Sequence, residues 1–528
     1  MTKSWGEFTA LSRFRPRTRT IAWVGLAVLA LAAIAFPLIN KYWPYRYGSV
    51  KPLLESVFAS KITIDRYHLT YFPHPGFVAE GLTLRRNTAL DLPPIGSAQR
   101  LIIEGSWLDL LTLRKRVLLV DVMGIHVVIP PVGSRANHED FPPGSSSDFA
   151  GPKTPVAELH VQDGLFEIMR NAGGRYSFPV HDLRVRNMKA GQAASYTVDM
   201  ENAKPTGRIQ ATGSFGPLTP SNLGGTPMSG KFVFSDVNLG EIGKLHGTLS
   251  SRGEFSGSLA AIEADATSDT PDFAVGRGKP VDVAGAVQCT INGLNANIVL
   301  HRIEAKTGRT VVHAGGDIMG SPKVTDLELT VEKGRAEDLL RPFLHDQVPI
   351  TGVVWLKSHA HIAPAGHGAK FLDRLQMDGG FNVPAERLTN PGTEKKLTAF
   401  SQRAQGSASS KGDPGDPAAT GVADVVSSLD GQVTIRKGML STHRLTFAMP
   451  GASADLNGTY NFRGGAVHLV GDLKMDSDIS HAATGFKSVL LKPLAPFFKK
   501  GNAGAVIPIA VTGVPHQYKV SQNLLHRK

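Results

Sequence analysis

The sequence predicts a mainly β protein held at a membrane by one N-terminal transmembrane helix. An apolar run without charged residues, Ile21–Ile39, follows a stub that is rich in Lys and Arg. From Lys61 onward, apolar and polar residues alternate with a period of two over short segments, which is typical of half-buried strands. The 56 Gly and 34 Pro among 528 residues indicate frequent turns and few long helices.

Residues 20–40 are predicted to form the membrane anchor. A helix of this length, at about 1.5 Å per residue, comes close to the roughly 30 Å hydrocarbon core of a bilayer. The basic stub, residues 1–19, is expected to remain in the cytoplasm, so that everything after the anchor is exported. A cleaved signal peptide is the alternative, because small residues occur between Ala30 and Ala35. The expected anchor residues are Ile21, Trp23, Leu26, Leu29, Leu31, Ile34, Phe36 and Ile39.

Aromatic residues follow the apolar run at once. Tyr42, Trp43, Tyr45 and Tyr47 have the spacing of an interfacial aromatic belt, in which amphipathic rings lie at the level of the lipid headgroups. The sequence therefore predicts that these rings contact the membrane surface.

The exported part is expected to form a β-rich body, residues 41–404, and a C-terminal β unit, residues 423–528. Residues 405–422 are rich in Ser, Gly, Asp, Pro and Ala, which is typical of a flexible linker. Short helices are predicted over 52–60, 107–113 and 336–343. The best helical candidate, near 484–500, has one apolar and one basic side, although Pro493 and Pro496 interrupt it.

Turn signals separate the predicted strands. Asp163-Gly164, Asn292-Gly293 and Asn457-Gly458 are dipeptides that favour tight turns. A small unit also recurs, in which glycine is followed by one polar residue and then by a large apolar residue. We interpret this unit as strands that enter from glycine turns. It occurs at Gly213-Ser214-Phe215, Gly230-Lys231-Phe232, Gly253-Glu254-Phe255, Gly316-Asp317-Ile318, Gly458-Thr459-Tyr460 and Gly471-Asp472-Leu473.

Composition and motifs argue against several functional classes. The chain carries a net charge of +12, but its cations are spread out and no nucleic-acid-binding motif is present. The single cysteine, Cys289, excludes an intramolecular disulfide. His359 and His361 would share a face of a strand and His367 follows closely, yet no Glu, Asp or Cys nearby completes a ligand set, so exposed strand histidines are favoured over a metal site. No nucleophile elbow, phosphate-binding loop or metalloprotease motif occurs, which favours a non-catalytic protein without cofactor or metal.

Several segments, taken together and in order, resemble the AsmA family of envelope proteins. Near the N-terminus these are the anchor, Tyr71–Gly76, Glu80–Thr83, Gly105–Leu111 and Met123–His126. In the C-terminal unit they are Ser428–Gly431, Lys437–Gly438, Met449–Gly451, Leu456–Tyr460, Val506–Ile509 and Thr512–Pro515.

The resemblance implies a single-pass protein of a bacterial inner membrane, with its N-terminus in the cytoplasm and its bulk in the periplasm. It also implies a long, curved antiparallel sheet, shaped like a taco, whose apolar groove holds the acyl chains of phospholipid during outer-membrane biogenesis. The groove candidates are Ile62, Ile64, Val433 and Ile435, which alternate with polar neighbours. A closed sandwich fits the same alternation. The alternative function is a non-catalytic scaffold that modulates the insertion of outer-membrane proteins together with assembly components.

Overall fold

The computed structural model describes residues 43–522 of the chain, except for 58–59, 87–92, 113, 115, 132–133, 137–153, 170–173, 219–221, 243, 321–322, 365–369, 406–424, 476–505 and 515–516. The predicted anchor, almost all of the predicted linker and the predicted helix near 484–500 lie outside the described residues.

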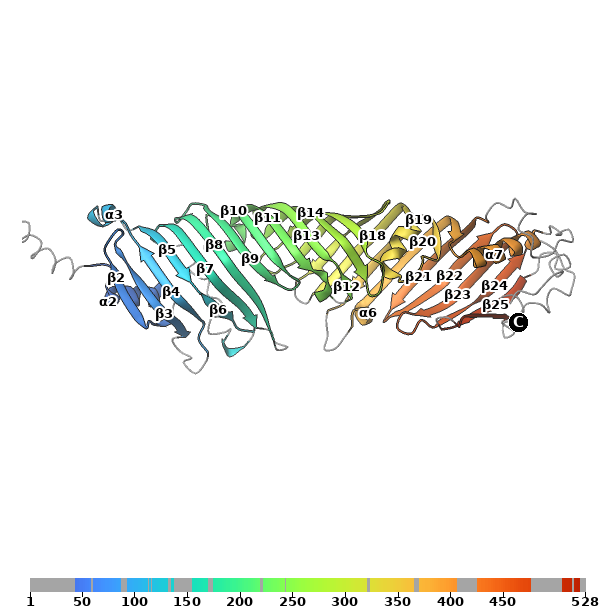
Figure 1. Ribbon diagram of the computed structural model, residues 1–528, viewed down its shortest axis with the longest axis horizontal. Coiled ribbons are helices and arrows are strands. Elements are labelled where there is room, and N and C mark those ends of the chain that lie inside the picture. The colour runs from blue at the N-terminus through green and yellow to red at the C-terminus, as the bar shows by residue number, and fades with distance from the viewer. Residues whose placement is uncertain are drawn as a thin grey trace, which may run out of the picture.

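The described part is mainly β and forms one long, curved, mixed sheet (Figure 1). Its first half contains β1 (Ser60–Thr63), β2 (Arg66–Thr70), β3 (Gly76–Arg86), β4 (Gly96–Glu104), β5 (Val117–Met123), β6 (His126–Ile129), β7 (Val156–Met169), β8 (Arg175–Met188), β9 (Ala194–Ala203), β10 (Thr206–Phe215), β11 (Pro227–Asn238), β12 (Leu245–His246) and β13 (Thr248–Ser258).

The second half of the sheet continues in the same direction along the molecule (Figure 1). It contains β14 (Ala261–Val275), β15 (Val281–Ile291), β16 (Ile298–Thr307), β17 (Thr310–Met319), β18 (Val324–Arg335), β19 (Ile350–Ile362), β20 (Leu375–Leu388), β21 (Ser427–Arg436), β22 (Met439–Met449), β23 (Ala452–Asn461), β24 (Val467–Met475), β25 (Val506–Gly513) and β26 (Lys519–Gln522).

Most strands pair antiparallel with the next strand in the chain, so the sheet is largely a meander. The prediction of a wholly antiparallel sheet is wrong at one place, because β5 and β6 both pair parallel with β7. Both strands also pair with β4, so they follow one another along its edge. The chain must therefore cross from the end of β6 back to the start of β7, since parallel neighbours cannot be joined by a tight turn.

Two of the predicted turns are wrong, and one is confirmed. β7 runs through Asp163-Gly164, where Asp163 adopts a φ of 51° inside the strand. Asn457-Gly458 lies inside β23, where Gly458 adopts a φ of 144°. Asp-Gly and Asn-Gly favour a turn because they readily adopt a positive φ. In both places a single residue with a positive φ is accommodated within the strand instead. Asn292-Gly293 does lie in the loop between β15 and β16.

The helices among the described residues are short, as the composition predicts. They are α2 (Tyr47–Val57), α3 (Trp107–Leu111), α5 (Ala336–Leu340), α6 (Phe371–Arg374) and α7 (Pro391–Ala404), together with the 3-10 turns η1 (Leu223–Gly225), η2 (Leu239–Glu241) and η3 (Arg341–Phe343). The sequence predicted α3 and α5, placed the start of α2 too late and missed α7. Within the described ranges, no helix has the length and apolar character needed to cross a membrane.

Buried apolar clusters form where a helix lies on the sheet. α2 contributes Val50 and Leu54 to a cluster with β1, β3 and β4, α5 contributes Ala336 to a second cluster on β18–β20, and α7 contributes Ala404 to a third on β23–β25. The described residues contain no such cluster on the strands between β9 and β17. This difference divides the sheet into covered regions and one long region that no described helix covers.

Candidate functional site

One face of the sheet is apolar along its whole length. Cross-strand pairing links a row of residues that passes through every long strand on this face, which we call the central row, and no member of it is charged. Its members are Tyr67, Ala79, Leu101, Val122, Val161, Leu183, Val198, Ala211, Phe232, Gly253, Ala266, Val287, Ile303, Ala314, Leu329, Ser358, Gly379, Val433, Thr442, Gly458, Leu469, Val511 and Val520.

The central row lies on what we call the apolar face, because alternate residues of each strand share a side of the sheet. Between β9 and β17 the large side chains of this face are half-buried, whereas the residues between them in sequence are mostly exposed. These eight long strands, β9–β11 and β13–β17, extend over about 40 Å at roughly 4.8 Å per strand. The large side chains include Tyr196, Met200, Ile209, Phe215, Phe232, Phe234, Phe255, Ile262, Val287, Ile291, Leu300 and Ile303.

The recurring glycine units are part of this face, so their interpretation as strand-entry turns is wrong. Each glycine and the large residue two positions later lie in one strand and on the same face. The glycine then stands beside a large residue of a neighbouring strand: Phe232 pairs with Gly253, and Phe255 pairs with Gly230. The glycine leaves room for the ring beside it, since a Cβ atom built on Gly230 would lie 2.8 Å from Phe255 Cζ.

At some of these glycines no other residue fits. A Cβ atom built on Gly316 would lie 2.0 Å from the carbonyl oxygen of Asp326, and the φ of Gly316 is 146°. The same distance separates a Cβ at Gly458 from the carbonyl oxygen of His468. Both are far below van der Waals contact, so these positions require glycine for the local bend of the strand.

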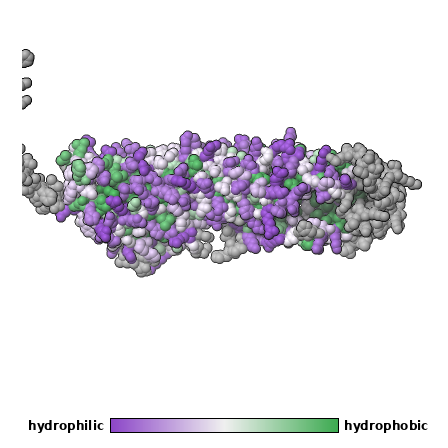
Figure 2. All heavy atoms as spheres, viewed as in Figure 1, coloured by the Kyte–Doolittle hydropathy of each residue, from purple (hydrophilic) through white to green (hydrophobic). Residues whose placement is uncertain are grey.

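The opposite face, which we call the outer face, carries cross-strand ion pairs. Arg208 Nη2 lies 2.5 Å from Asp199 Oδ2, and Arg436 Nη2 lies 2.6 Å from Asp378 Oδ2. In each case the hydrogen bond from the guanidinium lowers the pKa of the carboxyl group. The view in Figure 2 is correspondingly hydrophilic over much of the body, and hydrophobic atoms gather toward the N-terminal end.

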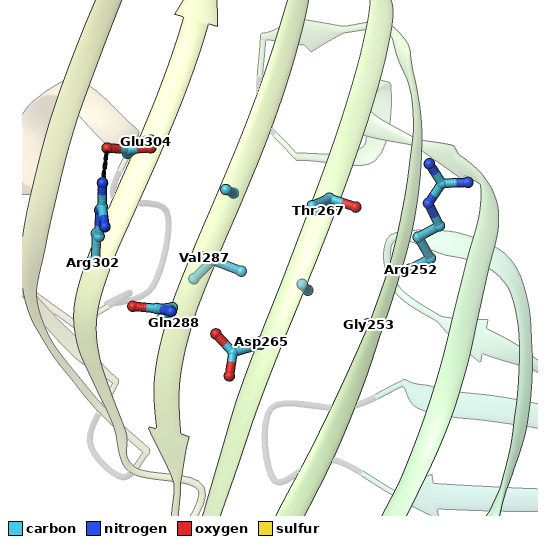
Figure 3. Close-up of a pocket in the computed structure, with 10 residues that line it drawn as sticks. Arg252, Gly253, Asp265, Thr267, Val287, Gln288, Arg302 and Glu304 are labelled. Carbon is cyan, nitrogen blue, oxygen red and sulfur yellow. Dashed lines mark hydrogen bonds and ion pairs between the residues drawn. The ribbon is translucent and has the colours of Figure 1, made fainter.

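A hollow on the outer face offers no apolar site. It has a volume of about 340 Å³ and lies over β13–β16, where the small residues Gly253, Ala266 and Ala286 separate larger side chains. Its rim carries charged and amide groups, and the Arg302 and Glu304 side chains bond to each other (Figure 3). The charged and amide side chains that line it are those of Arg252, Asp265, Gln288, Arg302 and Glu304. This side of the sheet is suited to water rather than to an apolar ligand.

The four predicted groove residues lie in different surroundings. Val433 and Ile435 lie on the apolar face of β21, paired with Gly379 and Met377. Ile62 also lies on this face but is only 1% exposed, because α2 covers it. Ile64 lies between β1 and β2 and packs against the same cluster. The half-buried aromatic residues of β9–β13 were not predicted as site residues, although the glycine units mark several of them.

Four cations gather at the edge of the sheet beside the uncovered region. All four are exposed: Lys244, Arg277 and Lys279 come from the loops next to β12 and β14, and Arg341 is the first residue of η3. Their backbones are linked, since the N–H of Gly276 donates to the carbonyl of Lys244 at 2.7 Å and the N–H of Lys279 donates to the carbonyl of Arg341 at 3.4 Å. We call this group the basic rim.

The histidine pair of β19 is placed on the outer face, away from the central row. His361 Nδ1 lies 2.6 Å from Asp326 Oδ1, and His359 Nε2 lies 3.9 Å from the same oxygen. Both histidines are exposed or half-exposed. Within the described residues no group of three or more His, Cys, Asp or Glu side chains is arranged to hold a metal ion.

Neither the models of known protein families nor the curated protein sequences give a match to this chain.

Proposed function

We propose that this protein is an AsmA-like protein, anchored in a bacterial inner membrane, whose apolar face binds or conducts phospholipid acyl chains through the periplasm. The observation that carries the proposal is the uncharged central row, which continues across the region between β9 and β17, where the described residues form no buried cluster. Apolar surface of this extent on a folded protein marks an interaction site.

The mechanism is passive exchange of one apolar environment for another. An acyl chain that leaves the bilayer for the apolar face loses few hydrocarbon contacts, so the net change in free energy is small. The half-buried rings of Phe232, Phe234 and Phe255 supply the contact surface. Neighbouring strands repeat the same surface, so a lipid can move along the sheet without a step in which its chains enter water.

The basic rim gives the lipid headgroup a place at the edge of the sheet. Phosphate attracts exposed Lys and Arg side chains, with about 1 kcal/mol per cation near a charged surface. Replacement of Lys244, Arg277, Lys279 and Arg341 by Gln should weaken retention of phosphatidylglycerol more than that of a zwitterionic lipid. Equal retention of both lipids by this variant would remove the basic rim from the mechanism.

Two adjacent residues of β11 allow a matched test of the proposal. Phe232→Asp places a charge on the apolar face, whereas Val233→Asp places it on the outer face, where Val233 is 46% exposed. Transfer of a fluorescent phospholipid between liposomes by the full chain should fall several-fold for Phe232→Asp and remain unchanged for Val233→Asp. Equal transfer by both variants, with both folded, would argue against the proposal and in favour of the scaffold function.

A further inference from the structure

Among the residues that the structure describes, the most exposed apolar side chains lie at the N-terminal end. The turn between β2 and β3 presents Tyr71 and Phe72, which are 42% and 89% exposed. α3 presents Trp107, Leu108 and Leu111, which are 40%, 67% and 79% exposed. We call these five residues the terminal patch, and hydrophobic atoms are visible at this end of the molecule in Figure 2.

The terminal patch is a built surface rather than a frayed end. Trp43 is 5% exposed, and its ring centroid lies 5.1 Å from that of Tyr71 and 5.6 Å from that of Trp107. The N–H of Gly105 donates to the carbonyl of Pro75 at 2.8 Å, which joins the start of α3 to the turn. α3 buries none of its own residues. It therefore contributes little to the core of this protein, and Leu108 and Leu111 face outward.

Cations border the terminal patch. Arg114 and Arg116 follow α3 directly and are exposed, and Arg46 is exposed just before α2. Asp109 of α3 is half-buried and is the acidic residue within that helix. Exposed aromatic and leucine side chains bordered by arginines are the composition of surfaces that lie in the interface of an anionic bilayer.

The position of the patch in the chain identifies the bilayer as its occupant. Trp43, which holds the patch together, comes four residues after the end of the uncharged run at Ile39. Four residues of fully extended chain cover at most about 14 Å. If that run crosses the membrane, Trp43 lies within this distance of the hydrocarbon boundary whatever path the chain takes.

We infer that the terminal patch docks on the bilayer, inserting Phe72, Leu108 and Leu111 among the headgroups and acyl boundary. This inference rests on the proposed membrane anchor and assigns a second contact to it. The docked patch fixes the first strands of the sheet against the membrane instead of leaving them on a flexible tether. The prediction that Trp43 contacts the membrane surface is replaced here, because its ring is buried beneath the patch.

The test uses the full chain in liposomes of phosphatidylethanolamine and phosphatidylglycerol. Cys289→Ser removes the single natural cysteine, and a polarity-sensitive fluorophore is attached at Leu111→Cys. Leu294→Cys is the matched control, because Leu294 is 59% exposed and lies in the loop between β15 and β16. Lipids that carry a nitroxide near the headgroup should quench the label at position 111 at least three-fold more than the label at position 294.

Two outcomes would overturn the inference. The first is equal, weak quenching at both positions with both labels accessible to iodide, which would place the patch in water. The second is protection of position 111 from iodide without quenching by lipid, which would assign the patch to a protein partner. The readout does not depend on lipid transfer. Loss of transfer with strong quenching at position 111 would therefore count against the proposed function alone.

Discussion

Two valines on the apolar face should respond very differently to the same substitution. Val331 lies in the cluster covered by α5 and is 1% exposed, whereas Val287 lies in the central row of the uncovered region and is half-buried. Val331→Asp removes about 1.5–3 kcal/mol of apolar burial. The carboxyl group must also remain neutral, and protonating an Asp side chain at neutral pH, about 3 units above its ordinary pKa, costs about 4 kcal/mol.

We therefore expect Val331→Asp to lower the free energy of unfolding by at least about 5 kcal/mol. Val287→Asp should cost only about 1 kcal/mol, because its carboxylate stays in contact with water and only part of the apolar burial is lost. Ala286→Asp, on the exposed face of the same strand, is the control for any effect of charge on β15.

The assay is hydrogen exchange of the full chain in nanodiscs, resolved by peptide. This method reports opening of β15 and of β18 separately, which matters because a sheet this long need not unfold in one step. A loss of protection in β15 for Val287→Asp as large as that in β18 for Val331→Asp would refute the reasoning. It would mean that the region between β9 and β17 is a closed core.

Three further predictions concern topology, backbone and pH. A reporter that is active only in the periplasm should be active after Lys528, and activity should fall when the orienting charges are neutralised at Arg13, Arg15, Arg17 and Arg19. Gly316→Ala should lower the protection of β17 against hydrogen exchange, whereas Gly464→Ala, which has no atom within 4 Å of an added Cβ, should leave the protection of β23 and β24 unchanged. Burial raises the pKa of Glu386, so its stabilising contribution is complete at low pH and is lost as the pH rises through the folded-state pKa. Unfolding at pH 4 and pH 8 should show that Glu386→Gln loses less stability between these values than the unmodified chain does.

The period-two alternation was sufficient to predict the β class. It also placed Val433 and Ile435 on one face, because a strand offers only two sides to its residues. The parallel pairing of β5 and β6 with β7 was not predictable, since the alternation of a strand is the same whichever direction its neighbour runs. The turn signal at Asp163-Gly164 misled for a related reason, because a strand also accepts a single left-handed residue.

Which parts of the apolar face a helix covers depends on long-range packing. The alternation of apolar and polar residues could not predict it. Ile62 and Phe232 have similar sequence surroundings, yet α2 buries the first and no described helix covers the second. The helix α7 was not predicted because its mean hydropathy is low. Only a few of its residues, such as Ala404 and Phe400, pack on the sheet. The glycine units did carry usable information, since a mid-strand glycine beside a cross-strand aromatic residue indicates close approach.

Position-resolved photo-crosslinking in living cells tests the central claim most directly. A photoreactive amino acid is introduced into the full chain at Phe232 and Val287 on the apolar face, at Val233 on the outer face and at Ile62 beneath α2. If the apolar face conducts lipid, mass spectrometry of the crosslinked peptides should find phospholipid adducts at Phe232 and Val287 and none at Val233 or Ile62. Absence of adducts at both apolar-face positions, or equal adducts at Val233, would contradict it.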